Sequence, residues 1–228
     1  MEWLFARGDG FDLVRLVLSG ASLAGGLAYF AFTAQPPTPP RAALKAVGFG
    51  LLIPVPLTFL GSAPGAETGL IVLALALALS TAGDILLALR NQERFFVFGL
   101  GAFLCAHLAY LAVLLPLVNV SGILPALSAV ALLVAAGAMM AWLWPGLGRM
   151  RVPVTAYFAV ITAMTVAAIL ARGVPVPGAI GAVLFLLSDS LIGVRKFKAP
   201  FPLVSEAIWA TYYAGQALLA GGILYALV

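Results

Sequence analysis

Eight long runs of apolar residues constrain the fold of this chain more than any other feature of its sequence. Each run is close to the about 20 residues that an α-helix needs to cross the hydrocarbon core of a bilayer. The runs lie near residues 13–32, 42–60, 69–89, 95–117, 123–143, 152–170, 176–194 and 203–227. The sequence therefore predicts an all-α integral membrane protein, a bundle of about eight transmembrane helices that forms a single transmembrane domain over residues 1–228.

The composition agrees with a surface that faces lipid. Charged residues make up 9% of the chain, whereas a soluble domain carries about 25%. The net charge of +4 comes from basic residues near the ends of the apolar runs, without stacking aromatics between them, so nucleic acid is not expected as a partner. The single histidine and single cysteine offer no tight metal-ligand spacing, and no phosphate-binding loop occurs, so neither a metal nor a cofactor is expected.

The basic residues predict which side of the membrane each loop faces. Nine of the 12 Lys and Arg residues lie in or beside the loops near 33–41, 90–94, 144–151 and 195–202, with Lys45 counted in the first of them. The other three are Arg7, Arg15 and Arg172. Because basic loops are retained in the cytoplasm, we expect these four loops inside and both termini outside. Heavy use of Ala, Gly and Arg favours a bacterial inner (plasma) membrane as the location.

Two acidic residues fall inside the predicted membrane helices. Asp84 precedes Arg90 by six residues, and Asp189 precedes Arg195 by six residues, which places each carboxyl about 9 Å inside the predicted cytoplasmic boundary. A carboxylate within a bilayer costs roughly 2.5–3.5 kcal/mol unless it meets a partner or water. We expect the two side chains to share one wet cavity, where mutual repulsion and burial keep one carboxyl protonated while the other ionises. Such a pair supplies the acid and the base that a hydrolysis needs.

Two alternative roles for these aspartates stay open from the residues alone. Each aspartate could pair with a polar neighbour and only hold helices together. A proton-coupled transporter of a small molecule or a lipid would also place paired acids in the membrane. Residues 83–90 and 188–195 are similar to each other and lie four helices apart, so a duplication into two parallel four-helix halves would fit them, as in some transporters.

Further polar and aromatic side chains of the predicted helices are candidates for the walls of the cavity. They are Ser80, His107, Tyr110, Ser188, Tyr212, Tyr213 and Gln216. Ser80 lies one turn before Asp84, so its hydroxyl could orient that carboxyl or bond back to its own helix. His107 is the only histidine, and a purely structural role is as compatible with its position as a functional one. The last run carries its polar and aromatic residues on one stripe, which we expect to face the bundle interior.

Five short motifs, in order along the chain, resemble those of the YhhN-type lysoplasmalogenase family. The motifs are Ser80-Thr81-Ala82-Gly83-Asp84; Phe98-Gly99 with Phe103, His107 and Tyr110; Pro153 with Tyr157; Phe185-Leu186-Leu187-Ser188-Asp189; and Thr211-Tyr212-Tyr213-Ala214-Gly215-Gln216. The first looks like the family's S-x-x-G-D motif and the second like F-G-x-x-x-F-x-x-x-H-x-x-Y. The resemblance runs from about residue 80 to residue 216. It does not extend to the first two apolar runs or to the loop between the fourth and fifth.

The resemblance implies an enzyme, namely a multi-pass hydrolase that cleaves the vinyl ether bond of lysoplasmalogen. The products would be a fatty aldehyde and glycerophosphoethanolamine or glycerophosphocholine. The catalytic residues would be Asp84 and Asp189, and Tyr157 would join the cavity. A lysophospholipid substrate and membrane lipid are the expected partners, and Arg90, Arg195 and Lys196 are expected near the lipid phosphate. A related hydrolase for a different lysolipid is the remaining alternative, and the oligomeric state is not predicted.

Overall fold

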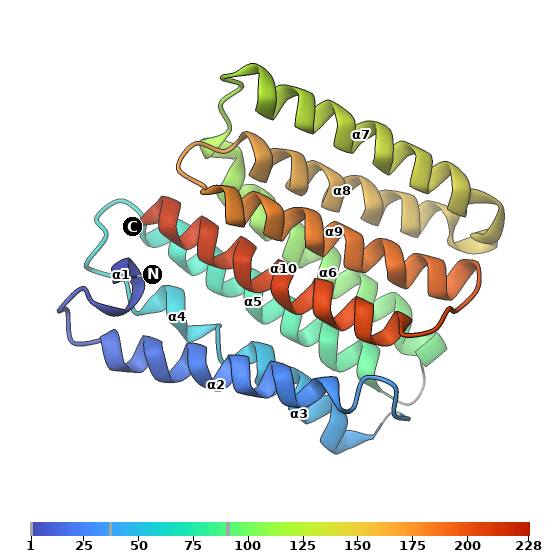
Figure 1. Cartoon of the computed structure of the whole chain (residues 1–228), viewed down its shortest axis with the longest axis horizontal. Helices are drawn as coiled ribbons and strands as arrows, with labels where there is room; N and C mark the ends of the chain where they lie inside the picture. The colour runs from blue at the N-terminus through green and yellow to red at the C-terminus, as the bar shows by residue number, and fades with distance from the viewer. Residues whose placement is uncertain (1, 37, 90–91) are drawn as a thin grey trace. The chain divides into compact units, whose positions relative to one another are not determined.

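The named elements of the chain are all helices in the computed structural model, which describes residues 2–36, 38–89 and 92–228. The α-helices are α1 (Glu2–Phe5), α2 (Asp12–Phe30), α3 (Pro39–Gly50), α4 (Pro54–Leu57), α5 (Glu67–Ala88), α6 (Gln92–Leu114), α7 (Ile123–Leu143), α8 (Arg151–Leu170), α9 (Val176–Phe197) and α10 (Val204–Leu227). Short 3-10 helices cover Leu115–Leu117, Trp144–Gly146 and Gly148–Met150. Figure 1 shows their order along the chain.

The predicted all-α membrane fold is confirmed. Within the described ranges, seven helical segments are long and apolar enough to cross a bilayer, with Pro39–Leu57 counted as one segment. The helix α10, which is not among these seven, has 24 residues and is therefore about 36 Å long, also enough to span. Glu206, Tyr212, Tyr213 and Gln216 interrupt its hydrophobic residues.

The second predicted helix differs from the expectation, because it starts earlier and is broken. It begins at Pro39, since proline is tolerated in the first turn, where no intrahelical donor is needed. The Thr38 side chain caps this start by accepting from the Arg41 amide at 3.4 Å. The chain then forms turns between Gly50 and Pro54, because proline supplies no amide hydrogen to continue the helical hydrogen bonds.

The seventh helix also differs, because it continues past the predicted end. The helix α9 extends to Phe197, whereas the sequence placed residues 195–202 in a loop. Arg195 and Lys196 therefore lie in its last turn, where positive charge is stabilised by the unpaired carbonyl groups and the helix dipole.

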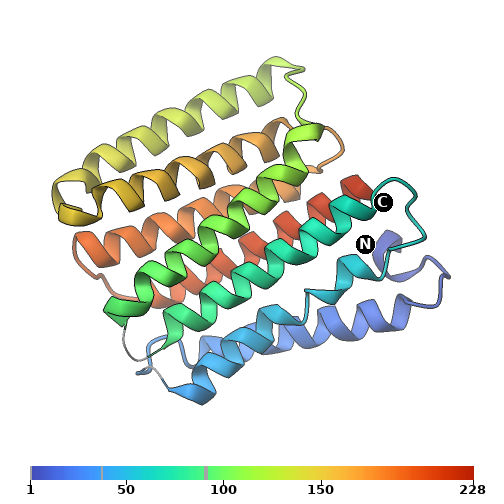
Figure 2. The same cartoon turned by 180° about the vertical axis from the view of Figure 1, so that it is seen from behind.

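The chain forms two compact units, residues 1–109 with 227–228, and residues 110–226. In the first unit α2 packs on α3, and α5 packs on both α3 and α4. In the second unit α7, α8 and α9 pack in sequence, side by side in both views (Figures 1 and 2). The proposed duplication into two parallel halves remains a prediction.

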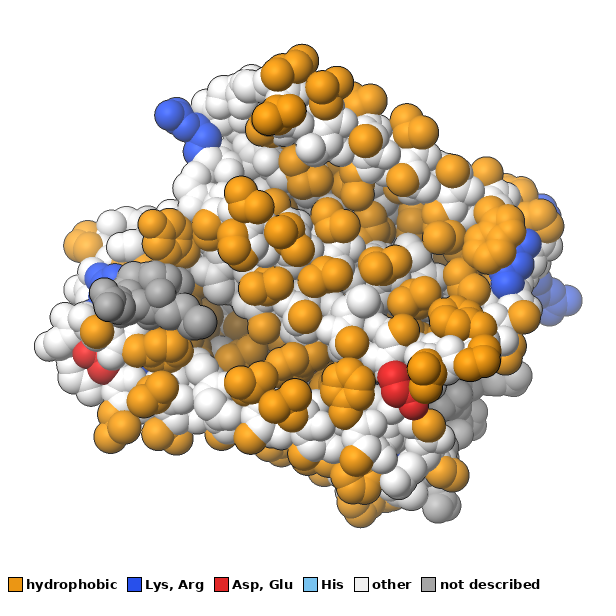
Figure 3. Space-filling view, in the orientation of Figure 1, with side chains coloured by type: hydrophobic (Ala, Val, Ile, Leu, Met, Phe, Trp, Pro, Cys, Tyr) orange, Lys and Arg blue, Asp and Glu red, His pale blue; other side chains and the backbone are white. Residues whose placement is uncertain are grey.

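The surface has the composition expected for contact with lipid. Hydrophobic side chains cover most of the face in Figure 3, and the few charged side chains visible there lie near helix ends. The helix α7 illustrates this, because residues such as Leu124 and Val134 are about 70% exposed (74% and 68%). Exposed apolar surface of this extent is stable in a hydrocarbon environment and unfavourable in water.

Candidate functional site

The first predicted catalytic residue, Asp84, lies about one turn before the end of α5 and is fully buried. Its Oδ1 atom forms an ion pair with Lys45 Nζ at 2.6 Å. Lys45 belongs to α3, one and a half turns after its start, so it lies in the helix and not in the loop with which the sequence analysis counted it. A buried carboxylate needs a compensating charge, and α3 supplies one.

Two glycines allow α5 and α6 to approach closely beside Asp84. A Cβ atom on Gly83 would lie 2.6 Å from the Phe103 ring, and one on Gly99 would lie 2.7 Å from Leu87 Cδ2. The Phe103 ring in turn stacks on His107, with ring centroids 6.4 Å apart. The first two sequence motifs therefore contact each other in space, and His107 is completely buried.

Ser80 lies one turn before Asp84 and is also completely buried. Among the described residues, its hydroxyl oxygen has no hydrogen-bond partner. The neighbouring Thr81 hydroxyl donates to the Leu77 carbonyl of its own helix at 2.9 Å, which is the ordinary way to satisfy a hydroxyl within a membrane helix. Ser80 thus presents a buried polar atom next to Asp84, but a bond between the two is not seen.

The second predicted catalytic residue, Asp189, lies on α9 about two turns before its end and is half-buried. The Tyr157 hydroxyl, from the adjacent helix α8, donates a short hydrogen bond to Asp189 Oδ2. Tyr157 itself is buried. Tyr157 of the third motif and Asp189 of the fourth motif are therefore hydrogen-bonded to each other.

A series of hydrogen-bonded side chains connects the last part of α6 to α10. The Tyr110 hydroxyl donates to Gln216 Oε1 at 2.6 Å, and Gln216 Nε2 donates to the Tyr212 hydroxyl at 3.3 Å. All three side chains are buried. The Tyr212 ring meets Phe185 edge to face, with centroids 5.5 Å apart. Tyr213 is half-buried against Trp209, with ring centroids 5.7 Å apart. The stripe of α10 thus faces protein, as its spacing indicated.

Close packing of α9 on α10 fixes these residues in place. A Cβ atom on Gly215 would lie 2.7 Å from the Phe185 amide nitrogen, and one on Gly178 would lie 2.9 Å from Gly222 Cα. A real Cβ atom does not tolerate such distances, so these glycines let the two helix backbones approach directly. Ser188 takes part in the same interface, because its hydroxyl donates to the Ile208 carbonyl at 3.2 Å.

The residues expected near a lipid headgroup are exposed where the structure describes them. Arg195 and Lys196 are both exposed, and an Arg195 guanidinium nitrogen donates to the Ser205 hydroxyl at 3.4 Å. The third residue, Arg90, lies outside the described residues.

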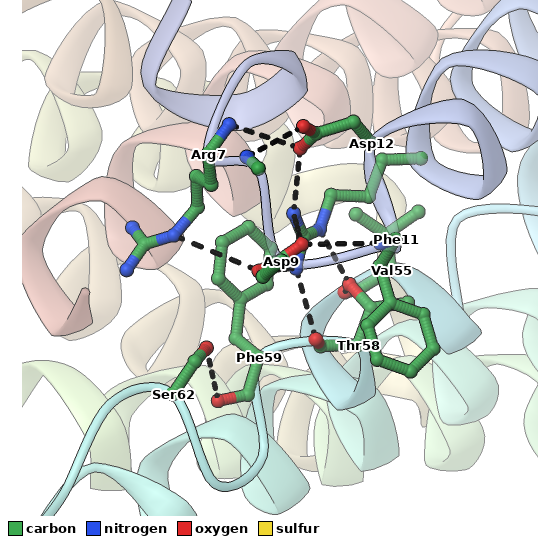
Figure 4. A network of polar contacts seen from close by, with 10 residues as sticks. Arg7, Asp9, Phe11, Asp12, Val55, Thr58, Phe59 and Ser62 are labelled. Atoms are coloured by element: carbon green, nitrogen blue, oxygen red, sulfur yellow. Dashed lines mark hydrogen bonds and ion pairs between the residues drawn. The ribbon is translucent and has the colours of Figure 1, made fainter.

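A separate polar cluster, which no sequence motif indicated, surrounds Arg15. Figure 4 labels its members Asp9, Asp12 and Thr58. Arg15 is completely buried. Its guanidinium donates to both Asp9 carboxylate oxygens at 2.9 and 2.7 Å and to Asp12 Oδ1 at 3.2 Å. It also donates to the Thr58 hydroxyl at 2.8 Å and the Thr58 carbonyl at 2.9 Å, and it lies 3.8 Å from the Phe59 ring centroid. The Arg15 hydrogen bond lowers the pKa of Asp9 below its ordinary value. The cluster joins the segment before α2 to the end of α4.

These observations define a class: a multi-pass α-helical membrane protein with carboxyl, hydroxyl and amide groups held inside its helices. The sequence pattern of the YhhN family matches residues 40–223, and the chain belongs to this family. Relatives from Mycobacterium bovis and Mycobacterium tuberculosis, each named lysoplasmalogenase, are 40% identical to it over 156 residues, 66% of this chain and 59% of theirs. A lysoplasmalogenase of Bos taurus is 32% identical over 157 residues, 63% of this chain and 61% of its own.

The chain spans about three fifths of the length of these curated relatives. No solved structure matches it.

Proposed function

We propose that this protein hydrolyses the vinyl ether bond of lysoplasmalogen within the membrane, with Asp84 and Asp189 as its two catalytic carboxyls. One observation carries the proposal: both carboxyls lie inside helices, and each has a dedicated polar partner, Lys45 or Tyr157. Intramembrane acids held in this way are costly and are typical of functional sites. The names of the relatives point to the same substrate.

The chemistry requires an acid, a negative charge and a water molecule. One carboxylic acid donates its proton to the outer alkene carbon of the vinyl ether, and the inner carbon becomes an oxocarbenium ion. The second carboxyl, as a carboxylate, stabilises this cation, in the same way that carboxylate pairs act in glycoside cleavage. Water adds to the cationic carbon and releases a proton. The resulting hemiacetal breaks into a fatty aldehyde and the glycerol hydroxyl, so that one water is consumed overall.

The placement of the groups suits a lysolipid in the inner leaflet. Asp84 and Asp189 lie one and two turns from the ends of their helices, or about 6 and 12 Å along the helix axis. The ether of a lysolipid lies just below its headgroup, at a similar depth. Arg195 and Lys196, in the last turn of α9, would then meet the phosphate, with both termini on the outer side of a bacterial inner membrane.

The test is aldehyde release from a synthetic lysoplasmalogen by the purified protein in lipid bilayer discs. The matched control substrate carries a saturated alkyl ether at the same position, which cannot be protonated to an oxocarbenium ion. We expect turnover of the vinyl ether only, and in heavy water the aldehyde gains one deuterium on the carbon next to its carbonyl. Equal turnover of the alkyl ether, or an aldehyde without deuterium, would contradict the mechanism. Absence of aldehyde from the vinyl ether substrate, with the folded protein present, would contradict the function.

A further inference from the structure

The ion pair between Lys45 and Asp84 is largely shielded from solvent. The Nζ to Oδ1 distance is 2.6 Å, and the side chains are 16% and 1% exposed. If Asp84 took up a proton, the attraction between the two charges would be lost in a largely buried place. An opposite charge this close favours the charged form of a carboxyl, so the pair favours the ionised carboxylate.

Among the described side chains of the helices around α5, no other charged or titratable group competes for this role. Arg41, the second base of α3, donates to the Phe32 carbonyl at 2.7 Å and to the Thr33 carbonyl at 2.9 Å. The helix α4 has no titratable side chain. The described part of α6 contributes His107, buried against Phe103, the exposed Cys105, and Tyr110, whose hydroxyl donates to Gln216. Lys45 is therefore the base of α3 that is directed at Asp84.

We infer that Lys45 is a positioning residue that holds Asp84 as a carboxylate. This assignment rests on the proposed function. In the proposed reaction, Asp84 is then the carboxylate that stabilises the oxocarbenium ion, and it remains ionised throughout.

The first test compares the pH profiles of aldehyde release for the wild-type protein, Lys45→Met and Lys45→Arg. Loss of the neighbouring charge allows Asp84 to take up a proton more readily, so in Lys45→Met the acidic limb of the profile moves to higher pH by about 1–3 units. Lys45→Arg retains the positive charge and keeps the wild-type limb. A purely structural salt bridge would lower the amount of folded protein without moving the profile. An active Lys45→Met protein with an unshifted limb would overturn the inference.

The second test needs no activity and also applies if Lys45→Met does not fold. Infrared difference spectra between wild-type protein and Asp84→Asn at neutral pH report the protonation state of this carboxyl directly. We expect the substitution to remove carboxylate bands and no band of a protonated carboxyl. Loss of a protonated-carboxyl band would refute the assignment. If the wild-type protein releases no aldehyde, the proposed function fails, and the infrared result still decides the charge of Asp84.

Discussion

Replacing Arg15 by methionine should destabilise the protein more than any other change of a single charged residue in its N-terminal segment. Arg15 makes five hydrogen bonds, three of them to carboxylates. Removing one partner of a buried ion pair costs about 3–5 kcal/mol. The side chains of Asp9 and Asp12 are 21% and 27% exposed, so water can solvate them in part once the arginine is gone. We therefore expect a loss near the lower end of this range, about 3 kcal/mol in the free energy of unfolding.

The matched control is Arg7→Met, because Arg7 contacts the same carboxylate from a more exposed position. Its Nε atom lies 3.8 Å from Asp9 Oδ2, and its side chain is 25% exposed, so the expected loss is below about 1 kcal/mol. Arg15→Lys keeps the charge but loses the planar guanidinium, so its loss in the free energy of unfolding should lie between those of Arg7→Met and Arg15→Met. The measurement is equilibrium unfolding in mixed detergent micelles. Equal losses for Arg7→Met and Arg15→Met would refute the reasoning.

The remaining predictions concern the same cluster and the packing of the helices. The pKa of Asp9 lies below its ordinary value of 3.8, so the stability contributed by this group is present above that pH and lost as the pH falls through the lowered pKa. The difference in unfolding free energy between wild-type protein and Arg15→Met should therefore shrink below about pH 4. Gly215→Ala, whose Cβ would meet backbone atoms of α9, should cost about 1–3 kcal/mol, whereas Gly221→Ala, with open space around it, should not destabilise; thermal unfolding separates the two. Tyr110→Phe leaves a buried amide oxygen without its donor and should cost about 1–3 kcal/mol in the same unfolding measurement.

The membrane fold could be predicted from the sequence because it follows from the length and apolarity of the runs. The fifth run, 123–143, coincides with α7 (Ile123–Leu143). The errors occur where proline and helix-end effects decide the boundary. Proline allowed α3 to begin at Pro39, and the favourable placement of positive charge allowed α9 to continue to Phe197. The polar residues of α10 recur at helical spacing, and two members of this stripe, Trp209 and Gln216, are buried.

The partners of the candidate site were harder to predict, because pairing depends on which helices are neighbours. Lys45 was counted only as a topology signal. In the structure it lies six residues after the start of α3, about 9 Å along the helix, whereas the predicted start near residue 42 would place it only about 4.5 Å in. The Arg15 cluster was missed for a different reason, since Thr58 is 43 residues away in sequence, and no local pattern connects the two.

The central claim, that both aspartates take part in vinyl ether hydrolysis, is tested most directly by the rate of aldehyde release from lysoplasmalogen in Asp84→Asn and in Asp189→Asn. Glu67→Gln is the matched control, because Glu67 lies at the opposite end of α5 from Asp84 and is exposed. An amide neither donates a mobile proton nor carries charge, so each aspartate substitution should lower the rate at least about 100-fold, while Glu67→Gln retains the wild-type rate. Wild-type turnover by a folded Asp84→Asn or Asp189→Asn protein would contradict the claim.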